Sequence, residues 1–167
     1  MNLHRFSMLR WLTLLACGIW LGMLILLGFG VAPVIFTFMD SKTQAGLLNG
    51  IILHRMNIAE GVCACIIVSS SVIFLLSSKT KFHLLRLLVS ALLLASLGYY
   101  SLVITPRMNE LKRTIQSFDI PKTLDTSPER EEFDRLHTLY SSLVSVNAAL
   151  LMVLSFMIAM ARKQDQE

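Results

Sequence analysis

The sequence predicts an all-α integral membrane protein, a single-domain bundle of four membrane-spanning helices. Of its 167 residues, 54% are hydrophobic and 16% are charged, against about 25% charged residues in an ordinary soluble domain. Four windows, 11–38, 56–78, 87–106 and 136–161, contain only one Asp, Glu, Lys or Arg side chain between them. Each window reaches the roughly 20 residues that a helix needs to cross a hydrocarbon core. None shows the period-2 alternation of a barrel strand, so helices are expected.

The first window is expected to stay in the protein as an anchor. Its apolar run is longer than the roughly 7–15 residues of a cleaved signal peptide, and no A-x-A cleavage site follows it. The window is also longer than a bilayer requires, so the helix should tilt, kink or emerge near Pro33. A short interfacial helix is expected in the loop before the second window.

The remaining elements follow from breaks in the apolar pattern. A short basic turn over 77–81 joins the second and third windows, and the third ends at Pro106. The loop 107–135 is expected outside the membrane, with an amphipathic helix that lies on the membrane surface or caps the bundle. Ser127 and Pro128 then begin a helix of about 35 residues that continues through the fourth window.

The two halves of the chain share one pattern, in which a span ends in a proline and the next begins near a histidine. The prolines are Pro33 and Pro106, and the histidines are His54 and His137. Two parallel two-helix repeats would explain the pattern and would place both histidines at equivalent depths. The alternative is a coincidence of short motifs.

The distribution of basic residues predicts the orientation. The N-terminus, the 77–86 turn and the C-terminus together carry a net charge of +5, whereas the other two loops sum to zero. Both termini are therefore expected in the cytoplasm, and in a bacterium the membrane would be the plasma (inner) membrane. The lipid bilayer is the expected partner, and no basic stripe interleaved with aromatic residues indicates nucleic-acid binding.

The candidate site consists of polar side chains at the helix ends on the non-cytoplasmic side. Glu60 is the only carboxylate within a window. A charge at the bilayer centre costs on the order of 3 kcal/mol or more, so Glu60 should face the bundle interior. We expect a cluster near the outer leaflet that comprises His54, Asn57, Glu60, Arg107, Asn109, His137 and Tyr140.

Two interpretations of this cluster remain open. In the first, it binds a small ligand, with His54 and His137 as ligands of a transition metal or of haem. In the second, the side chains only hold helices and loops together, with Glu60 paired to Arg55 or Arg107.

Three functions fit the sequence. The favoured one is a protein without catalytic activity that binds or moves a small solute or metal ion through the polar cluster. A haem- or metal-linked membrane redox enzyme and an assembly scaffold are the alternatives. The sequence contains no recognisable catalytic motif. Transport would require a homo-oligomer, because four helices enclose little space.

Several segments together resemble the transmembrane protein 205-like family, which is also catalogued as domain of unknown function 4149. The resemblance implies a four-span membrane protein and covers nearly the whole chain, and its most specific positions are Pro106, Arg107, Phe133 and His137. The Trp-Leu-Gly of the first span is more distantly similar to copper resistance D proteins and bacterial membrane protoporphyrinogen oxidases, whose histidines handle metal or haem. The segments that carry the main resemblance are Ala16 to Gly22, Ala32-Pro33-x-x-Phe36, Ala45-Gly46, Thr105 to Glu110 and Phe133-x-x-Leu136-His137.

Overall fold

The computed structural model describes residues 3–121 and 123–164, and the side chains among them from 6 to 160. Arg5, Lys122, Arg162 and Lys163, which enter the charge count above, lie outside the described side chains. The described residues form helices and no strands, and four continuous helical segments are long and apolar enough to cross a membrane. The predicted four-helix membrane bundle is confirmed. The segments are α1 (Leu3–Ile25) with η1 (Leu26–Val31) and α2 (Ala32–Phe38), then α3 (Lys42–Ser77), then α4 (Lys81–Tyr99) with η2 (Tyr100–Ile104) and α5 (Thr105–Thr114), and finally α6 (Pro128–Gln164).

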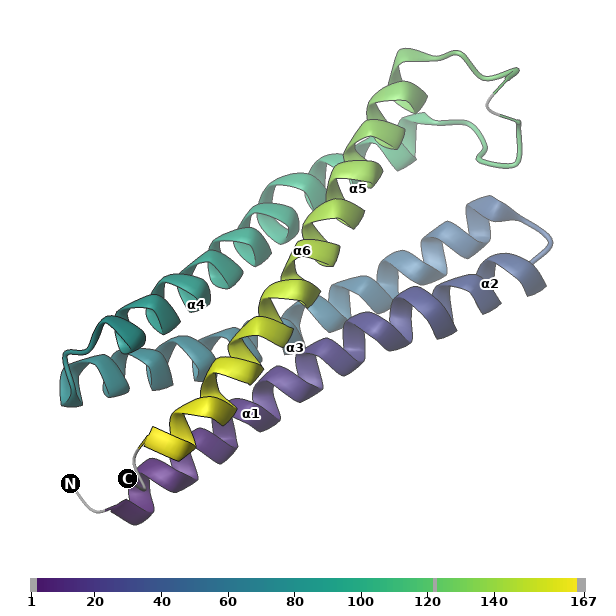
Figure 1. Cartoon of the computed structure of the whole chain (residues 1–167). Coiled ribbons are helices and arrows are strands. Elements are labelled where there is room, and N and C mark those ends of the chain that lie inside the picture. The colour runs from purple at the N-terminus through teal and green to yellow at the C-terminus, as the bar shows by residue number, and fades with distance from the viewer. Residues whose placement is uncertain (1–2, 122, 165–167) are drawn as a thin grey trace.

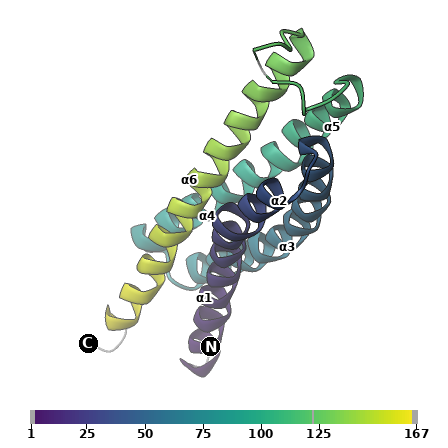
Figure 2. The ribbon, with the colours of Figure 1, turned by 90° about the vertical axis from the view of Figure 1, so that its right-hand side faces the viewer.

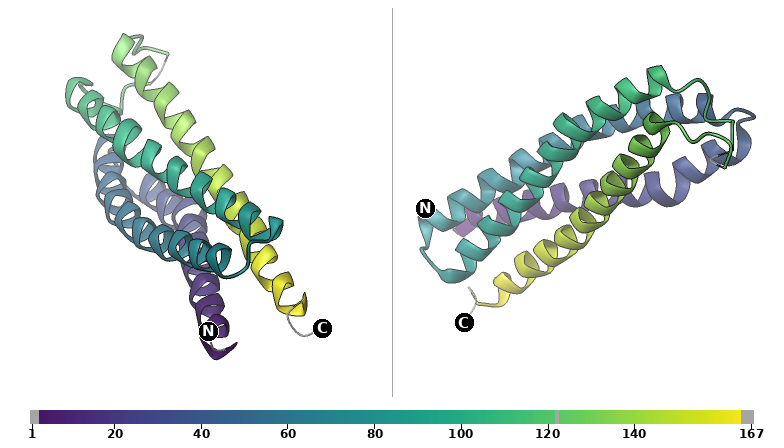
Figure 3. Two further views of the ribbon diagram at one scale, coloured as in Figure 1. Left: turned by 90° about the vertical axis from the view of Figure 1, so that its left-hand side faces the viewer. Right: turned by 90° about the horizontal axis from the view of Figure 1, so that it is seen from above.

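The described helices form an up-and-down bundle. The N-terminal end of α1, the turn between α3 and α4 and the C-terminal end of α6 lie at one end of the molecule (Figure 1). The connections from α2 to α3 and from α5 to α6 lie at the opposite end (Figure 2). Helix α1 packs against α3 and α6, and α4 packs against the same two helices, as the views in Figure 3 show.

Apolar side chains lie both inside and outside the bundle. Trp20, Ile67, Leu93 and Leu154 are at most 1% exposed and form part of a continuous core. Many large apolar side chains face outward, among them Phe29, which is 83% exposed. A surface of this kind is stable against lipid chains rather than against water, in agreement with four membrane spans.

Both prolines that end a predicted span follow a π-helical segment. Pro33 is the second residue of α2 after η1, and Pro106 is the second residue of α5 after η2. Proline has no N–H and its ring clashes with the carbonyl four residues earlier, so regular α-helix is disfavoured at these points. The chain shifts to bonds over five residues, in which the Ala32 N–H donates to the Leu27 carbonyl and the Thr105 N–H donates to that of Tyr100. The irregularity expected near Pro33 is this π segment. The second half of the chain has the same feature before Pro106, so the two halves share a π segment followed by a proline.

Two helix boundaries differ from the sequence expectation. Helix α3 begins at Lys42, so the segment expected as a separate interfacial helix forms the first turns of α3. The amphipathic segment after Pro106 is α5, a continuation of the third span, and its buried Met108 and Leu111 face the bundle, where α5 packs on α6. Of the two positions expected for this segment, it therefore takes the one that caps the bundle.

Asp119 ties the long loop to the start of α3. Its carboxylate accepts hydrogen bonds from the hydroxyls of Ser41 (2.8 Å) and Thr43 (3.1 Å) and from the backbone N–H of Lys42. A carboxylate at this place also complements the positive end of the helix dipole. The Ser41 hydroxyl and the other donors lower the pKa of Asp119 below its ordinary value.

We expect Asp119→Asn to loosen this connection. A carboxyl group whose pKa is lowered in the folded protein stabilises it above the ordinary pKa of about 4, and this stabilisation is lost as the pH falls through the lowered value. In hydrogen-exchange measurements from pH 6 to pH 3, corrected for intrinsic rates, residues 41–45 of the original protein should lose protection only at the acidic end. The variant should lack this protection throughout.

Asp125→Asn is the matched control, because the Asp125 carboxylate bonds the backbone and hydroxyl of Ser127 instead. It should leave the exchange of residues 41–45 unchanged. Equal protection of these residues in Asp119→Asn and in the original protein would contradict the role assigned to Asp119.

Candidate functional site

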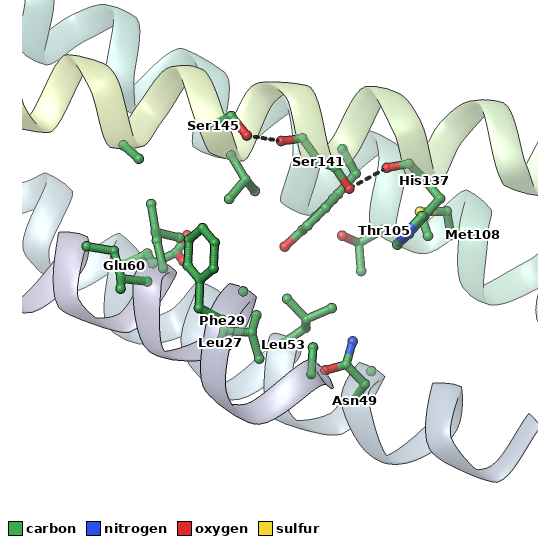
Figure 4. Close-up of a pocket in the computed structure, with 18 of the residues that line it drawn as sticks. Leu27, Phe29, Asn49, Leu53, Glu60, Thr105, Met108, His137, Ser141 and Ser145 are labelled. Atoms are coloured by element: carbon green, nitrogen blue, oxygen red, sulfur yellow. Dashed lines mark hydrogen bonds between the residues drawn. The ribbon is translucent and has the colours of Figure 1, made fainter. Parts of the chain in front are cut away.

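A cavity of about 440 Å³ lies in the half of the bundle that carries the α2–α3 and α5–α6 connections. Helices α1, η1, α2 and α3 line one side, and α5 and α6 line the other (Figure 4). A volume of this size fits a small organic molecule. The lining combines apolar side chains such as Leu24, Phe29 and Leu53 with a few polar ones.

The inner end of the cavity holds Glu60, which is 2% exposed. Glu60 lies near the middle of α3 (Figure 4), and its Oε2 accepts a hydrogen bond from the Tyr100 hydroxyl. The rings of Tyr100 and Tyr140 meet edge to face at 5.1 Å, and the Tyr140 hydroxyl donates to Asn57 Oδ1 over 3.5 Å. The carboxylate is thus part of a buried chain of polar groups that joins α3, η2 and α6.

Two further buried side chains border this chain with unused hydrogen-bonding capacity. Trp20 Nε1 lies close to Glu60, and the Asn147 amide lies close to Tyr100. Neither reaches a partner with hydrogen-bond geometry within the described part of the chain, although both side chains are fully buried. Such groups cost free energy, typically about 1–3 kcal/mol each, and in a native protein they call for an explanation.

The outer end of the cavity is also polar. The Lys112 ammonium, half-buried, donates to the Gly46 carbonyl at 3.3 Å and lies 5.9 Å from the centre of the Phe133 ring. His137 lines the cavity and stacks on Phe133 with ring centres 6.1 Å apart. Asn49 and Asn109 complete this end (Figure 4 shows Asn49 and His137).

The structure brings some of the predicted site residues to the cavity but not all. The cavity lining includes Glu60, Asn109, His137 and Tyr140. Asn57 does not line the cavity, but it accepts a hydrogen bond from the Tyr140 hydroxyl. His54 is exposed and does not line the cavity. Arg107 points to α6, where it pairs with Glu132 at 2.8 Å, and also pairs with Glu110 at 3.2 Å.

Glu60 lies further from the loop end of its helix than the sequence window indicates. The sequence window placed it one or two turns inside the span, near the outer leaflet, but α3 extends fourteen residues further toward the loop. Trp20, Tyr100 and Asn147 are likewise close to the midpoints of their helical segments. The buried polar chain therefore lies near the middle of the bundle, and the cavity runs from there to the loop end.

Within the described residues, no group of three or more His, Cys, Asp or Glu side chains is placed to hold a metal ion. His137 could ligate a metal only with partners that the described cavity lining does not supply, since Glu60 is the only other residue of these types there.

The site residues that were not predicted from the sequence include Trp20, Tyr100 and Lys112. Trp20 and Tyr100 lie in apolar windows, where an aromatic residue reads as core packing. The sequence carries no signal of their proximity to Glu60, because the second window places Glu60 near one end of its span, whereas Trp20 and Tyr100 lie well inside theirs. Lys112 carries no signal either, since it belongs to the polar face of an amphipathic helix.

A second buried polar group, at the other end of the bundle, is structural. The Arg86 guanidinium, 1% exposed, donates to the Ser70 hydroxyl at 2.8 Å and lies 4.4 Å from the centre of the Phe74 ring. The Thr13 hydroxyl completes the group by donating to Ser70 at 2.6 Å. These contacts hold α1, α3 and α4 together at the end of the bundle that carries the start of α1 and the α3–α4 turn.

The comparisons with known proteins identify a family. The family model described as Domain of unknown function (DUF4149) matches residues 15–117, more than half of the chain, and this segment includes Trp20, Glu60, Tyr100 and Lys112. No curated protein and no solved structure matches the chain. The matched description does not carry the transmembrane protein 205 name, which stays a prediction. The chain belongs to the DUF4149 family, a membrane-spanning member with a polar-ended cavity inside its four-helix bundle.

Proposed function

We propose that this membrane protein binds a small, largely apolar solute in the cavity between α1–α2 and α6. The cavity itself carries the proposal. Its walls are mainly apolar, and polar groups gather at its two ends, an arrangement typical of ligand sites in which a few polar contacts fix orientation. Ionisable residues inside a membrane bundle are costly and usually mark ligand or ion pathways, and Glu60 fits this description.

The charge distribution that predicts cytoplasmic termini gives this proposal a direction. It places the outer end of the cavity, with Lys112 and His137, on the non-cytoplasmic side. A solute would then reach the cavity from that side or from the adjacent leaflet. Movement of the solute through the membrane would be a further step beyond binding.

The proposal is tested by filling the cavity. Val144 lines the cavity and Val146, two residues further along α6, is 51% exposed on the outer surface. We expect Val144→Phe to weaken binding of the neutral probe N-phenyl-1-naphthylamine at least tenfold, because the added ring occupies the cavity, whereas Val146→Phe should leave binding within twofold. Both variants are made on a Trp11→Phe background in phosphatidylcholine nanodiscs, so that quenching of Trp20, the remaining tryptophan, reports on the cavity.

Equal binding to both variants, or no saturable binding above that of empty nanodiscs, would contradict the proposal. A Soret band in the purified protein would instead favour the haem-linked redox alternative. Wild-type protein that carries stoichiometric metal, lost in His137→Ala, would favour binding of a metal ion.

A further inference from the structure

We infer that the solute is an organic cation, a molecule with an ammonium or similar single positive charge on an apolar body, and that its charge binds at Glu60. This inference rests on the proposed function and adds the chemical class of the ligand. It follows from two features of the inner end of the cavity: an acid that forms no ion pair within the described part of the chain, and aromatic rings close to that acid.

The first feature is that the acid at the inner end of the cavity, Glu60, has no ion-pair partner within the described residues. Glu60 is the only Asp or Glu in the cavity lining, and within the described residues no Lys, Arg or His side chain forms an ion pair with it. Its one hydrogen bond there with full geometry comes from Tyr100, to Oε2. A buried carboxylate needs a proton or a positive partner, because desolvation of an unpaired charge costs several kcal/mol. A cation in the cavity would supply this partner at Oε1.

The second feature is the set of aromatic side chains around the acid. Tyr140 lines the cavity, as does Phe29, which is largely exposed. Tyr100 and Trp20 lie close to Glu60 without lining the cavity. The faces of aromatic rings attract cations, most strongly where water is excluded. One carboxylate with several such rings is a suitable site for an alkylammonium group, which carries a diffuse charge and apolar substituents.

The same residues do not suit a zinc ion. Zinc in proteins takes three or four donor atoms from side chains such as His, Cys, Asp and Glu, whereas the described residues bring no such group together. An organic cation has no such requirement, since a single carboxylate neutralises it and the apolar body fills the remaining volume.

The positive group at the other end of the cavity sets the orientation of the ligand. Lys112 donates to the carbonyl of Gly46 and its ammonium lies beside Gly50, ten residues before Glu60 on α3, which corresponds to about 15 Å along a helix. Lys112 is therefore too far away to neutralise Glu60, and it repels a cation from the outer end. The favoured pose has the positive group inside, against Glu60, and the neutral body directed toward the loops.

The experiment compares three probes of similar shape on the full chain with Trp11→Phe in phosphatidylcholine nanodiscs: tetraphenylphosphonium, neutral triphenylphosphine oxide and anionic tetraphenylborate. Trp20 fluorescence is the readout, corrected with empty nanodiscs. We expect the cation to bind at least tenfold more tightly than the other two probes. Glu60→Gln, which keeps a group able to accept the Tyr100 hydrogen bond, should remove that preference, and Glu60→Asp, which keeps the charge, should retain most of it.

The outcomes separate this inference from the proposed function. If the neutral or anionic probe binds saturably and at least as tightly as the cation, the cavity binds solutes but the inference is wrong. The inference is also wrong if Glu60→Gln binds the cation as the original protein does. If none of the three probes binds saturably, the proposed function itself fails.

Discussion

Replacing Phe74 with alanine is expected to lower the free energy of unfolding by about 3–5 kcal/mol, the usual cost of deleting a buried aromatic side chain. Phe74 is 3% exposed and lies where α1, α3 and α4 meet. Its ring contacts Phe6 and His83, with ring centres 5.3 Å and 5.6 Å away, and the Arg86 guanidinium covers its face at 4.4 Å. The substitution therefore removes packing and also deprives a buried cation of its aromatic partner.

Two further variants separate these contributions. Phe74→Leu keeps most of the volume and loses the ring face, so it should cost less than the alanine variant, with a cation–π share of about 0.5–2 kcal/mol. Phe156→Ala, at a position 66% exposed on α6, should change stability by less than about 0.5 kcal/mol. The measurement is reversible unfolding in mixed detergent micelles. A Phe74→Ala variant as stable as Phe156→Ala would show that this end of the bundle is held by other contacts.

The sequence was sufficient for the fold because the bilayer imposes a simple rule. Backbone groups in hydrocarbon must bond within their own segment, so each long apolar window becomes a helix. The positions at which the helices begin and end were harder to predict. Lys42 and Arg55 made the first turns of α3 look like loop, although charged side chains are tolerated where a helix extends beyond the hydrocarbon or where the side chain reaches the interface. The charged residues of α5 likewise made it look like a loop helix rather than a continuation of the third span.

The candidate site was predicted in part, and the reason is visible in individual residues. Glu60 was identifiable because its charge is anomalous in an apolar window, and Tyr140 because it is a polar side chain near the start of the fourth window. Arg107 lies close in the sequence to Asn109, which does line the cavity. The Arg107 side chain instead points away from the cavity, because it forms an ion pair with Glu132 on α6. The direction of a side chain near a helix end depends on its partners on other helices, which periodicity does not reveal.

Replacing Asn147 with leucine is expected to increase the free energy of unfolding by about 1–3 kcal/mol, the cost that an unsatisfied buried polar group imposes. Asn147 is fully buried near the midpoint of α6, and neither atom of its amide has a partner with hydrogen-bond geometry in the described structure. Leucine has the same number and branching of heavy atoms, although it is larger, and it needs no partner. Ser142→Leu, at an exposed position on the same helix, serves as the control for the general effect of an added apolar side chain.

The same substitution should weaken binding of tetraphenylphosphonium. The Asn147 amide lies close to the Tyr100 hydroxyl, and that hydroxyl holds Glu60 in place, so its loss would leave the position of the carboxylate less defined. A protein that retains a destabilising group next to its binding residues gives up stability for function, as active and binding sites commonly do. If Asn147→Leu instead lowers stability by more than 1 kcal/mol, the amide is hydrogen-bonded in the folded protein and its role is structural. If the variant gains stability and binds the cation unchanged, Asn147 has no part in the site, and the organic-cation inference then depends on Glu60 and the aromatic rings alone.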